Sequence, residues 1–326
     1  MRAGTTALVF IAGLLLAAPV FAQGTGRSLD IQPGARENGM GAAGVALAES
    51  PSGMTWWNPA GLGFARKFGA DVTGAQLVPG LATDVYYMHV AAVTPIEGLG
   101  SVGFSNVFLS YGESEGVDIT GQPTGRFTSY EVSPALSYGV QLIPNVAFGV
   151  TAKWIRIQLA PQSYQGVGST VGFDLGGLWK IPIAFPGMKV SGVNAGVVLQ
   201  NLGPSVTFIN EDQASPLSRN LKAGFAAQGD MGGMFHLGLV ADYNQSLVTS
   251  SFRTYNGGVE LGVKPSGEIT ATLRAGYYYD KLGDIRNLTF GLGGNIGPGL
   301  FDFAAIPQAR DSGLDYVKKF TLGLRF

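Results

Sequence analysis

Residues 268–280, EITATLRAGYYYD, alternate apolar and polar or small side chains along their whole length. Ile269 and Leu273 fall in one phase, and Thr270 and Arg274 fall in the other. Successive side chains of a strand point to opposite faces, so a period of two predicts a β-strand with one apolar face. The charged side chain of Arg274 lies on the polar face, in the middle of this predicted strand.

The same period recurs along the chain after residue 67. About fourteen segments of strand length follow one another, separated by stretches rich in Gly, Pro, Asn and Asp. The most regular are 128–141, 145–158 and 254–264, and the last runs over 317–326. The sequence therefore predicts an all-β chain of consecutive antiparallel strands.

Charged residues within these segments fall in the polar or small phase. A Lys or Arg that faces lipid at mid-depth costs about 2–4 kcal/mol, so a membrane barrel keeps such residues on the side of its lumen. We expect these side chains to line a polar path or, as the favoured alternative, to pair with one another or anchor a plug. The candidate lumen residues are Glu131, Lys153, Asp174, Glu260 and Arg274.

The composition separates a membrane barrel from a soluble β-sandwich. Only 13% of the residues are charged, although a sandwich has a wet face on which charge is freely tolerated. Soluble domains average about 25% charged residues. We therefore predict a transmembrane antiparallel β-barrel of about fourteen strands, with the sandwich as the less favoured alternative.

The predicted connections alternate in length. One set is short and rich in Pro or Gly, and the other is longer and more polar, which is the asymmetry of outer-membrane barrels with short periplasmic turns. An even number of strands then places both termini on the periplasmic side. The predicted short turns are 94–98, 142–145, 182–187, 229–233, 265–267 and 297–299, and the predicted outer loops are 112–125, 159–165, 203–217, 246–253, 281–286 and 308–316, with 77–82 as a short exception.

The N-terminus has the features of an export signal. Arg2 precedes an apolar run over 7–16, and Ala22 ends a motif suited to cleavage. The apolar run is shorter than the roughly 20 residues that a membrane helix needs, so a membrane anchor is the less favoured alternative. We expect residues 1–22 to be a cleaved signal peptide of a protein exported to the outer membrane of a Gram-negative type of cell.

Residues 34–64, GARENGMGAAGVALAESPSGMTWWNPAGLGF, have neither strand alternation nor the composition of a simple turn. We expect a short helix from about Asn38 to Ser50, because the residue before a Pro is disfavoured in a helix. We expect residues 23–66 to be a plug inside the lumen of a barrel formed by 67–326, with a periplasmic extension as the alternative.

This N-terminal stretch resembles the PorV/PorQ family of outer-membrane proteins, within the FadL-like group of fourteen-stranded barrels with an N-terminal hatch. The resemblance covers about a tenth of the chain and follows an export signal. The matching residues are Ala35-Arg36, Gly39-Met40-Gly41, Gly44, Ala46-Leu47-Ala48 and Trp57-Asn58-Pro59-Ala60-Gly61.

The resemblance implies one of two functions. PorV-type members are accessory barrels of type IX secretion that bind exported proteins or pass them to an attachment complex. FadL-type members are passive channels for fatty acids and other hydrophobic molecules. The compact loops of this chain favour the first. In either case outer-membrane lipid and the barrel assembly machinery are implied partners.

The resemblance also assigns site residues. A terminal aromatic residue after an export signal resembles the signal that the assembly machinery reads, and Phe326 occupies that position. The hatch implies residues that hold or gate the lumen. The candidate plug and gating residues are Met40, Trp56, Trp57, Asn58, Pro59, Ala60 and Gly61.

The sequence has little that would support catalysis. His89 and His236 lie far apart, and neither belongs to an apparent Ser-His-Asp order. The chain has no Cys and no cluster of His, Asp and Glu with metal-ligand spacing, so we expect no metal and no cofactor. Its net charge of −1 gives no basic surface for nucleic acid. We therefore expect a protein that is not an enzyme.

Overall fold

The computed structural model describes residues 24–118, 120–183, 189–209, 212, 214–249, 251–266, 269–280, 282, 285–308 and 315–326. The expected signal peptide, 1–22, lies outside the described residues. Within them, no helix combines the length and the apolar character needed to cross a membrane.

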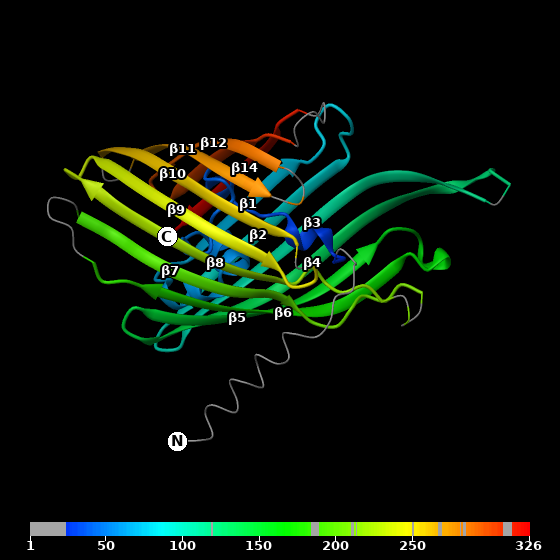
Figure 1. Ribbon diagram of the computed structural model, residues 1–326, viewed down its shortest axis with the longest axis horizontal. Helices are drawn as coiled ribbons and strands as arrows, with labels where there is room; N and C mark the ends of the chain where they lie inside the picture. Colours follow the sequence, from blue (N-terminus) through cyan, green and yellow to red (C-terminus); the bar gives the residue numbers. More distant parts are fainter. Residues whose placement is uncertain are drawn as a thin grey trace, which may run out of the picture.

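Fourteen strands of the described chain close into one ring, in which each strand pairs antiparallel with the next and β14 pairs with β1 (Figure 1). The predicted fourteen-stranded antiparallel barrel is confirmed. The strands are β1 (Gly69–Gln76), β2 (Val85–Ile96), β3 (Gly100–Val117), β4 (Pro123–Ile143), β5 (Val146–Gln158), β6 (Val167–Lys180), β7 (Lys189–Leu202), β8 (Asn220–Met231), β9 (Phe235–Ser246), β10 (Arg253–Ser266), β11 (Ile269–Asp280), β12 (Ile285–Ile296), β13 (Gly299–Ile306) and β14 (Val317–Arg325).

The alternation in sequence becomes an outer and an inner face. On β11, Leu273 is 65% exposed, whereas the neighbouring Arg274 is 6% exposed and faces the interior. The register places Glu260 of β10 directly opposite Arg274. Since the outer face is apolar on every side of the ring, the barrel wall has the pattern of a lipid-exposed surface.

The connections define two ends of the barrel. The short-turn end contains the connections 97–99, 144–145, 181–188, 232–234, 267–268 and 297–298, and the long-loop end contains 77–84, 118–122, 159–166, 203–219, 247–252, 281–284 and 307–316.

One predicted outer loop is wrong. Residues 112–117 and 123–125 continue β3 and β4 instead of forming a loop, and only 118–122 connect the two strands. The resulting hairpin projects well beyond its neighbours at the long-loop end (Figure 1). The two strands continue to pair beyond a register shift at Gly112. The polar composition of residues 112–125 therefore did not predict where the pairing of β3 and β4 ends.

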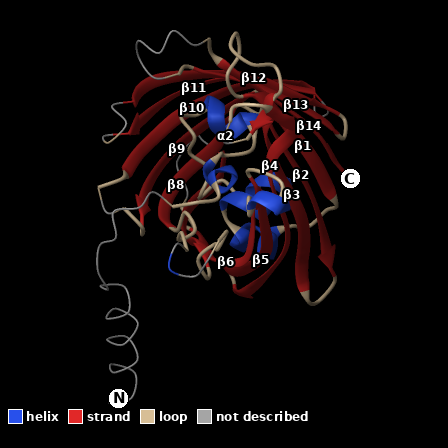
Figure 2. Cartoon of the chain, turned by 90° about the vertical axis from the view of Figure 1, so that its right-hand side faces the viewer, coloured by secondary structure: helices blue, strands red, loops and turns tan. Residues whose placement is uncertain are grey.

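Residues 24–66 lie inside the ring of strands (Figure 2). They form four short helical pieces, and a further short helix lies in the β5–β6 connection. The pieces are η1 (Arg27–Asp30), α2 (Ala35–Gly39), η2 (Gly53–Trp57), η3 (Pro59–Phe64) and, in the connection, η4 (Gln162–Tyr164).

The helix expected from about Asn38 to Ser50 is wrong, because α2 ends at Gly39. Gly41 and Ala42 adopt positive φ angles of 77° and 59°, which a continuing right-handed helix does not allow. Groups of the barrel wall replace the missing helical acceptors, for example the Thr289 hydroxyl, which accepts from the Gly41 amide at 2.9 Å.

Candidate functional site in the barrel lumen

The N-terminal segment, defined as residues 24–66, starts at the long-loop end. The Thr25 amide donates to the carbonyl of Pro216 at 2.8 Å, within the β7–β8 connection. The segment ends shortly before Gly69, where β1 begins at the short-turn end. It therefore runs lengthwise through the lumen. The expectation that both termini lie at the short-turn end is wrong for the start of the described chain, although β1 starts and β14 ends there.

Glu131 holds the start of the segment. Its carboxylate accepts from the amides of Arg27 and Ser28, at 3.3 and 2.9 Å, and from the Tyr111 hydroxyl at 2.6 Å. The first amides of a helical turn lack acceptors within the turn. A buried carboxylate on β4 supplies them, so the predicted lumen residue Glu131 lies where it fixes η1 to the wall.

Arg36 joins the segment to the opposite wall. Its guanidinium makes two hydrogen bonds to Glu260 of β10, at 3.1 and 2.8 Å, and one to Glu49 at 3.1 Å. Arg274 of β11 contacts Glu260 at 2.5 Å and Asp302 of β13 at 2.6 Å. Bidentate contacts between guanidinium and carboxylate are strong and geometrically specific. Two arginines therefore share one carboxylate across the segment–wall interface.

Burial and neighbouring charges shift the pKa values of Arg36 and Glu37, in the N-terminal segment, in opposite directions. Burial disfavours the charge of Arg36, but the carboxylates of Glu260 and Glu49 raise its pKa well above the ordinary value. Burial raises the pKa of Glu37 from its ordinary 4.5, and the nearby Arg36 opposes this effect. Arg36 is thus held as a cation, whereas Glu37 is poised toward its neutral form.

Lys153 and Asp174 pair within the wall. Their charged atoms lie 2.8 Å apart, Lys153 also donates to the Asn201 side chain at 2.8 Å, and the Asn201 amide donates to Asp174 at 2.8 Å. The five predicted lumen residues are all buried and inward-facing, yet they lie in three separate places: Glu131 by η1, the Lys153–Asp174 pair, and the Glu260–Arg274 pair by α2.

Asn58 links two parts of the segment to the wall. Its side-chain amide donates to the carbonyls of Val45 and Gly177, both at 3.1 Å, and its carbonyl accepts from the Ala60 amide at 3.1 Å. Pro59 starts η3 directly after this cap. A Pro at the first helical position lacks only an amide that would have no partner there. The Asn-Pro pair therefore both begins η3 and attaches it to β6.

The other predicted plug residues are buried contacts between segment and wall. Trp56 and Trp57 pack edge to face at 5.0 Å, and the Lys222 ammonium lies 4.3 Å from the Trp56 ring. A Cβ on Gly258 would lie 2.5 Å from the Met40 Cα, so the wall has room for Met40 only because that position is Gly. Ala60 and Gly61 belong to η3 and are also buried.

Sequence reasoning missed several wall residues that hold the segment. Asp242 of β9 accepts from the amides of Gly44 and Val45, at 2.7 and 2.9 Å. Gln200 of β7 donates to the Trp56 carbonyl at 2.6 Å. The available signal was their position in the inward phase of predicted strands, since an inward polar residue without a partner on the wall must find one in the lumen.

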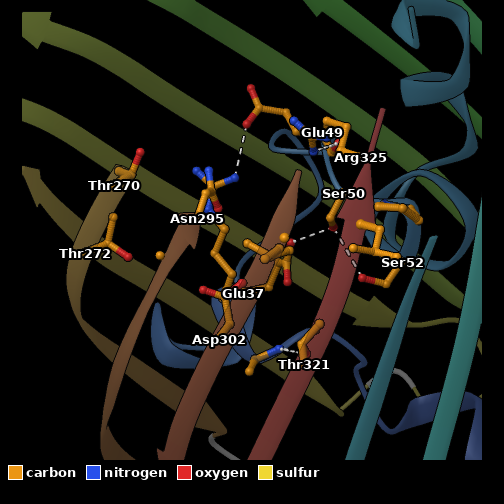
Figure 3. A pocket seen from close by; sticks show the side chains of 18 of the residues that line it. Glu37, Glu49, Ser50, Ser52, Thr270, Thr272, Asn295, Asp302, Thr321 and Arg325 are labelled. Carbon is orange, nitrogen blue, oxygen red and sulfur yellow. Dashed lines mark hydrogen bonds and ion pairs between the residues drawn. The ribbon is translucent and has the colours of Figure 1, made fainter. Parts of the chain in front are cut away.

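Two cavities flank the segment at the short-turn end. One, of about 370 Å³, lies between α2, residues 49–52 and strands β10 to β14 (Figure 3). The other, of about 340 Å³, lies between residues 47–54 and the start of β1. The Thr272 hydroxyl is buried in the wall of the first cavity and has no hydrogen-bond partner among the described residues.

The two histidines lie in different surroundings. His236 contacts Asp230 at 2.9 Å and Glu260 at 3.4 Å, whereas His89 is fully buried and neither of its ring nitrogens has a hydrogen-bond partner in the described chain. Among the described residues no group of three or more His, Cys, Asp and Glu could hold a metal ion.

The terminal Phe326 stacks on Phe68 at 6.4 Å, beside the start of β1.

Comparison with solved structures extends the fold assignment. A FadL homologue of Pseudomonas aeruginosa superposes with a TM-score of 0.52 and 13% identity, over 91% of this chain and 98% of that chain. The toluene transporter TodX of Pseudomonas putida superposes with a TM-score of 0.44 and 12% identity, over 89% of this chain and 95% of that chain. At such identity the first likeness concerns the fold alone.

Comparison with protein families addresses the sequence directly. The curated proteins contain no match to this chain. The family described as "Type IX secretion system protein PorV" matches residues 23–252, which include the N-terminal segment and β1 to β9. Members of this family are outer-membrane proteins, so the barrel is placed in the outer membrane. The chain belongs to the PorV family.

Proposed function

We propose that this chain is a non-enzymatic accessory barrel of type IX secretion, which binds exported proteins or a secretion or attachment complex at its long-loop end. The family match over residues 23–252 is the observation that carries the proposal. In this function residues 1–22 are a cleaved leader, 23–66 are a hatch and 67–326 are the barrel. The membrane lipid surrounds the wall, and the assembly machinery recognises Phe326.

The contacts in the lumen support a binding role over a conduit. The hatch is tied to β4 through Glu131, to β10 through Arg36, and to β6 through Asn58. A protein that captures a partner on its outer surface needs no open lumen. The surroundings of His89 and His236 also support a role without catalysis. Neither imidazole has a nucleophilic hydroxyl or thiol side chain among its described hydrogen-bond partners, so neither belongs to a nucleophile–base pair.

The β3–β4 hairpin is the surface that we assign to partner binding. Val117 is 63% exposed near its tip. The Asp118 carboxylate accepts from the amides of Thr120 and Gln122, at 2.8 and 2.9 Å. Hydrogen bonds from Thr120 first, and then from Gln122, lower the pKa of Asp118, which keeps this carboxylate charged. Because the hairpin projects beyond its neighbours, a partner outside the barrel can reach both of its strands (Figure 1).

The test is partner capture with a shortened hairpin. Residues 114–125 are replaced by a short Gly-Ser turn, and the matched control replaces 160–165 in the β5–β6 connection. Tagged proteins are purified from native outer membranes in mild detergent, and the retained proteins are identified by mass spectrometry. We expect secretion components or exported proteins to be retained by wild type and control and lost from the hairpin variant. Equal retention by both variants would refute this assignment.

A second function, passive uptake of hydrophobic molecules as implied by the FadL-like fold, is favoured by the cavity of about 370 Å³ beside the hatch. The charged side chains around that cavity weigh against an apolar ligand. Uptake of a labelled fatty acid is measured in cells that carry wild type, Asn58→Ala or no barrel. Uptake that depends on the barrel and changes in the variant would establish the channel, whereas uptake independent of the barrel rejects it.

A further inference from the structure

Four cations line the cavity of about 340 Å³ at the short-turn end, and we name them the rim cations: Arg66, Lys67, Lys180 and Arg325. None of them forms an ion pair within the described chain. The Arg66 guanidinium donates to the neutral side chain of Gln141 at 2.7 Å. The Arg325 guanidinium donates to the Glu49 carbonyl at 2.7 Å, and the Lys180 ammonium lies 4.2 Å from the Phe64 ring.

Three other cations of the lumen are paired with carboxylates, whereas the buried Lys222 contacts the Trp56 ring and the buried Lys319 donates to the Gln32 carbonyl and the Asn38 side chain. Lys153, Arg274 and Arg36 each lie within 3.1 Å of a carboxylate oxygen. Two rim cations, Lys67 and Arg325, line both cavities at the short-turn end. The Glu49 carboxylate between those cavities is engaged by Arg36. An uncompensated group of cations beside a cavity attracts an anion.

The outer wall next to these cations is hollowed. On the lipid-facing side, Ala70, Gly294 and Gly299 leave a groove of about 640 Å³ between larger apolar side chains. Leu324 borders the groove and precedes the rim cation Arg325. The groove and the cavity of about 370 Å³ share lining residues at this edge, namely Ala70, Gly294, Gly299, Leu300 and Leu324.

We infer that this groove and rim bind one anionic glycerophospholipid. Its acyl chain lies over Ala70, Gly294 and Gly299, and its phosphate lies against Lys67 and Arg325. A free phosphate would satisfy the cations but leave the adjoining apolar groove without an occupant. An uncharged hydrocarbon would fill the groove but leave the cations unpaired. A phospholipid matches both, because its charged and apolar parts are covalently joined at the level of the membrane surface where the rim lies.

The test measures lipid retention by the purified full-length protein. Phosphatidylglycerol is titrated into delipidated protein in detergent, and bound lipid is counted by native mass spectrometry. The rim variant is Lys67→Gln with Arg325→Gln. The groove variant is Ala70→Leu, which adds an apolar side chain on the lipid-facing side. The control is Arg126→Gln with Lys318→Gln, which removes the same charge from exposed positions toward the long-loop end.

We expect the rim variant to bind phosphatidylglycerol about 25-fold more weakly, from a contribution of about fivefold for each of the two cations near the phosphate. The groove variant should bind several-fold more weakly, and the control should match wild type. Equal retention by all four proteins overturns the inference. So does displacement of the lipid by an equal concentration of glycerol phosphate, which would identify a free-anion site. These results are independent of partner capture, so they leave the proposed secretion role untouched.

Discussion

Replacing Arg36 with Met tests whether the shared carboxylate holds the hatch in the lumen. The change removes the bidentate contact to Glu260 and the 3.1 Å contact to Glu49 while keeping most of the apolar stem. Removing one partner of a buried ion pair costs about 3–5 kcal/mol. Glu260 keeps its 2.5 Å contact to Arg274, so we expect the lower value, about 3 kcal/mol.

That free energy corresponds to an opening equilibrium about 100-fold more favourable. Hydrogen exchange measured by mass spectrometry, on peptides that cover residues 34–50, reports the opening directly. Arg126→Met is the matched control, because its pair with Glu113 spans 3.9 Å and both side chains are more than half exposed. Such a surface pair contributes about 0–1 kcal/mol. Exchange in Arg36→Met no faster than in the control would refute the anchoring argument.

Three further predictions concern the hatch and the terminal strand. Burial raises the pKa of Glu37 above its ordinary 4.5, so this carboxyl loses its proton at a lower pH in the unfolded chain than in the folded chain. The contribution of Glu37 to the free energy of unfolding therefore falls as the pH rises above about 4.5. Glu37→Gln should therefore stabilise the protein at about pH 8 and change it little at about pH 4, as measured by denaturant midpoints in micelles. Gly258→Val should push the N-terminal segment away from the wall and lower the free energy of unfolding by about 1–3 kcal/mol in the same assay. Gly257→Val, on the lipid-facing side, should change the free energy of unfolding by less than about 0.5 kcal/mol. Equal effects of the two substitutions would contradict the close fit at Met40. Phe326→Ala should lower the fraction of newly made protein that reaches the outer membrane, as followed by pulse labelling, and unchanged assembly would rule out its role as a recognition signal.

Strand existence and the inner face could be predicted because both depend on local physics. A side-chain period of two is fixed by strand geometry, and lipid excludes charge from the outer face. Arg274 shows this well, since its polar phase within 268–280 already assigned it to the lumen. Its opposite position to Glu260 across β10 and β11 also follows once the hairpin register is known.

The contacts of the hatch could not be predicted in the same way. Arg36 and Glu260 are 224 residues apart, and no local rule selects which inward carboxylate an arginine in the lumen will meet. The helix expected over 38–50 failed for a related reason. The wall supplies acceptors such as Asp242 to the amides of Gly44 and Val45, so the backbone has no need of helical hydrogen bonds there. Hydrogen-bond partners on the barrel wall replaced partners within a helix, and the periodicity of the sequence does not predict such long-range contacts.

Packing of the hatch also indicates where a path through this barrel would begin. Gly149 and Gly176 of the wall leave no space for a Cβ beside Pro59, so η3 lies in direct contact with β5 and β6. Residues 49–52 are instead flanked by two cavities. A path that breaks few contacts would therefore open along 49–52, next to the contact between Arg36 and Glu49. The Arg36→Met variant thus separates the two candidate functions: a surface-binding barrel keeps its partners when the hatch loosens, whereas a conduit changes its rate of uptake.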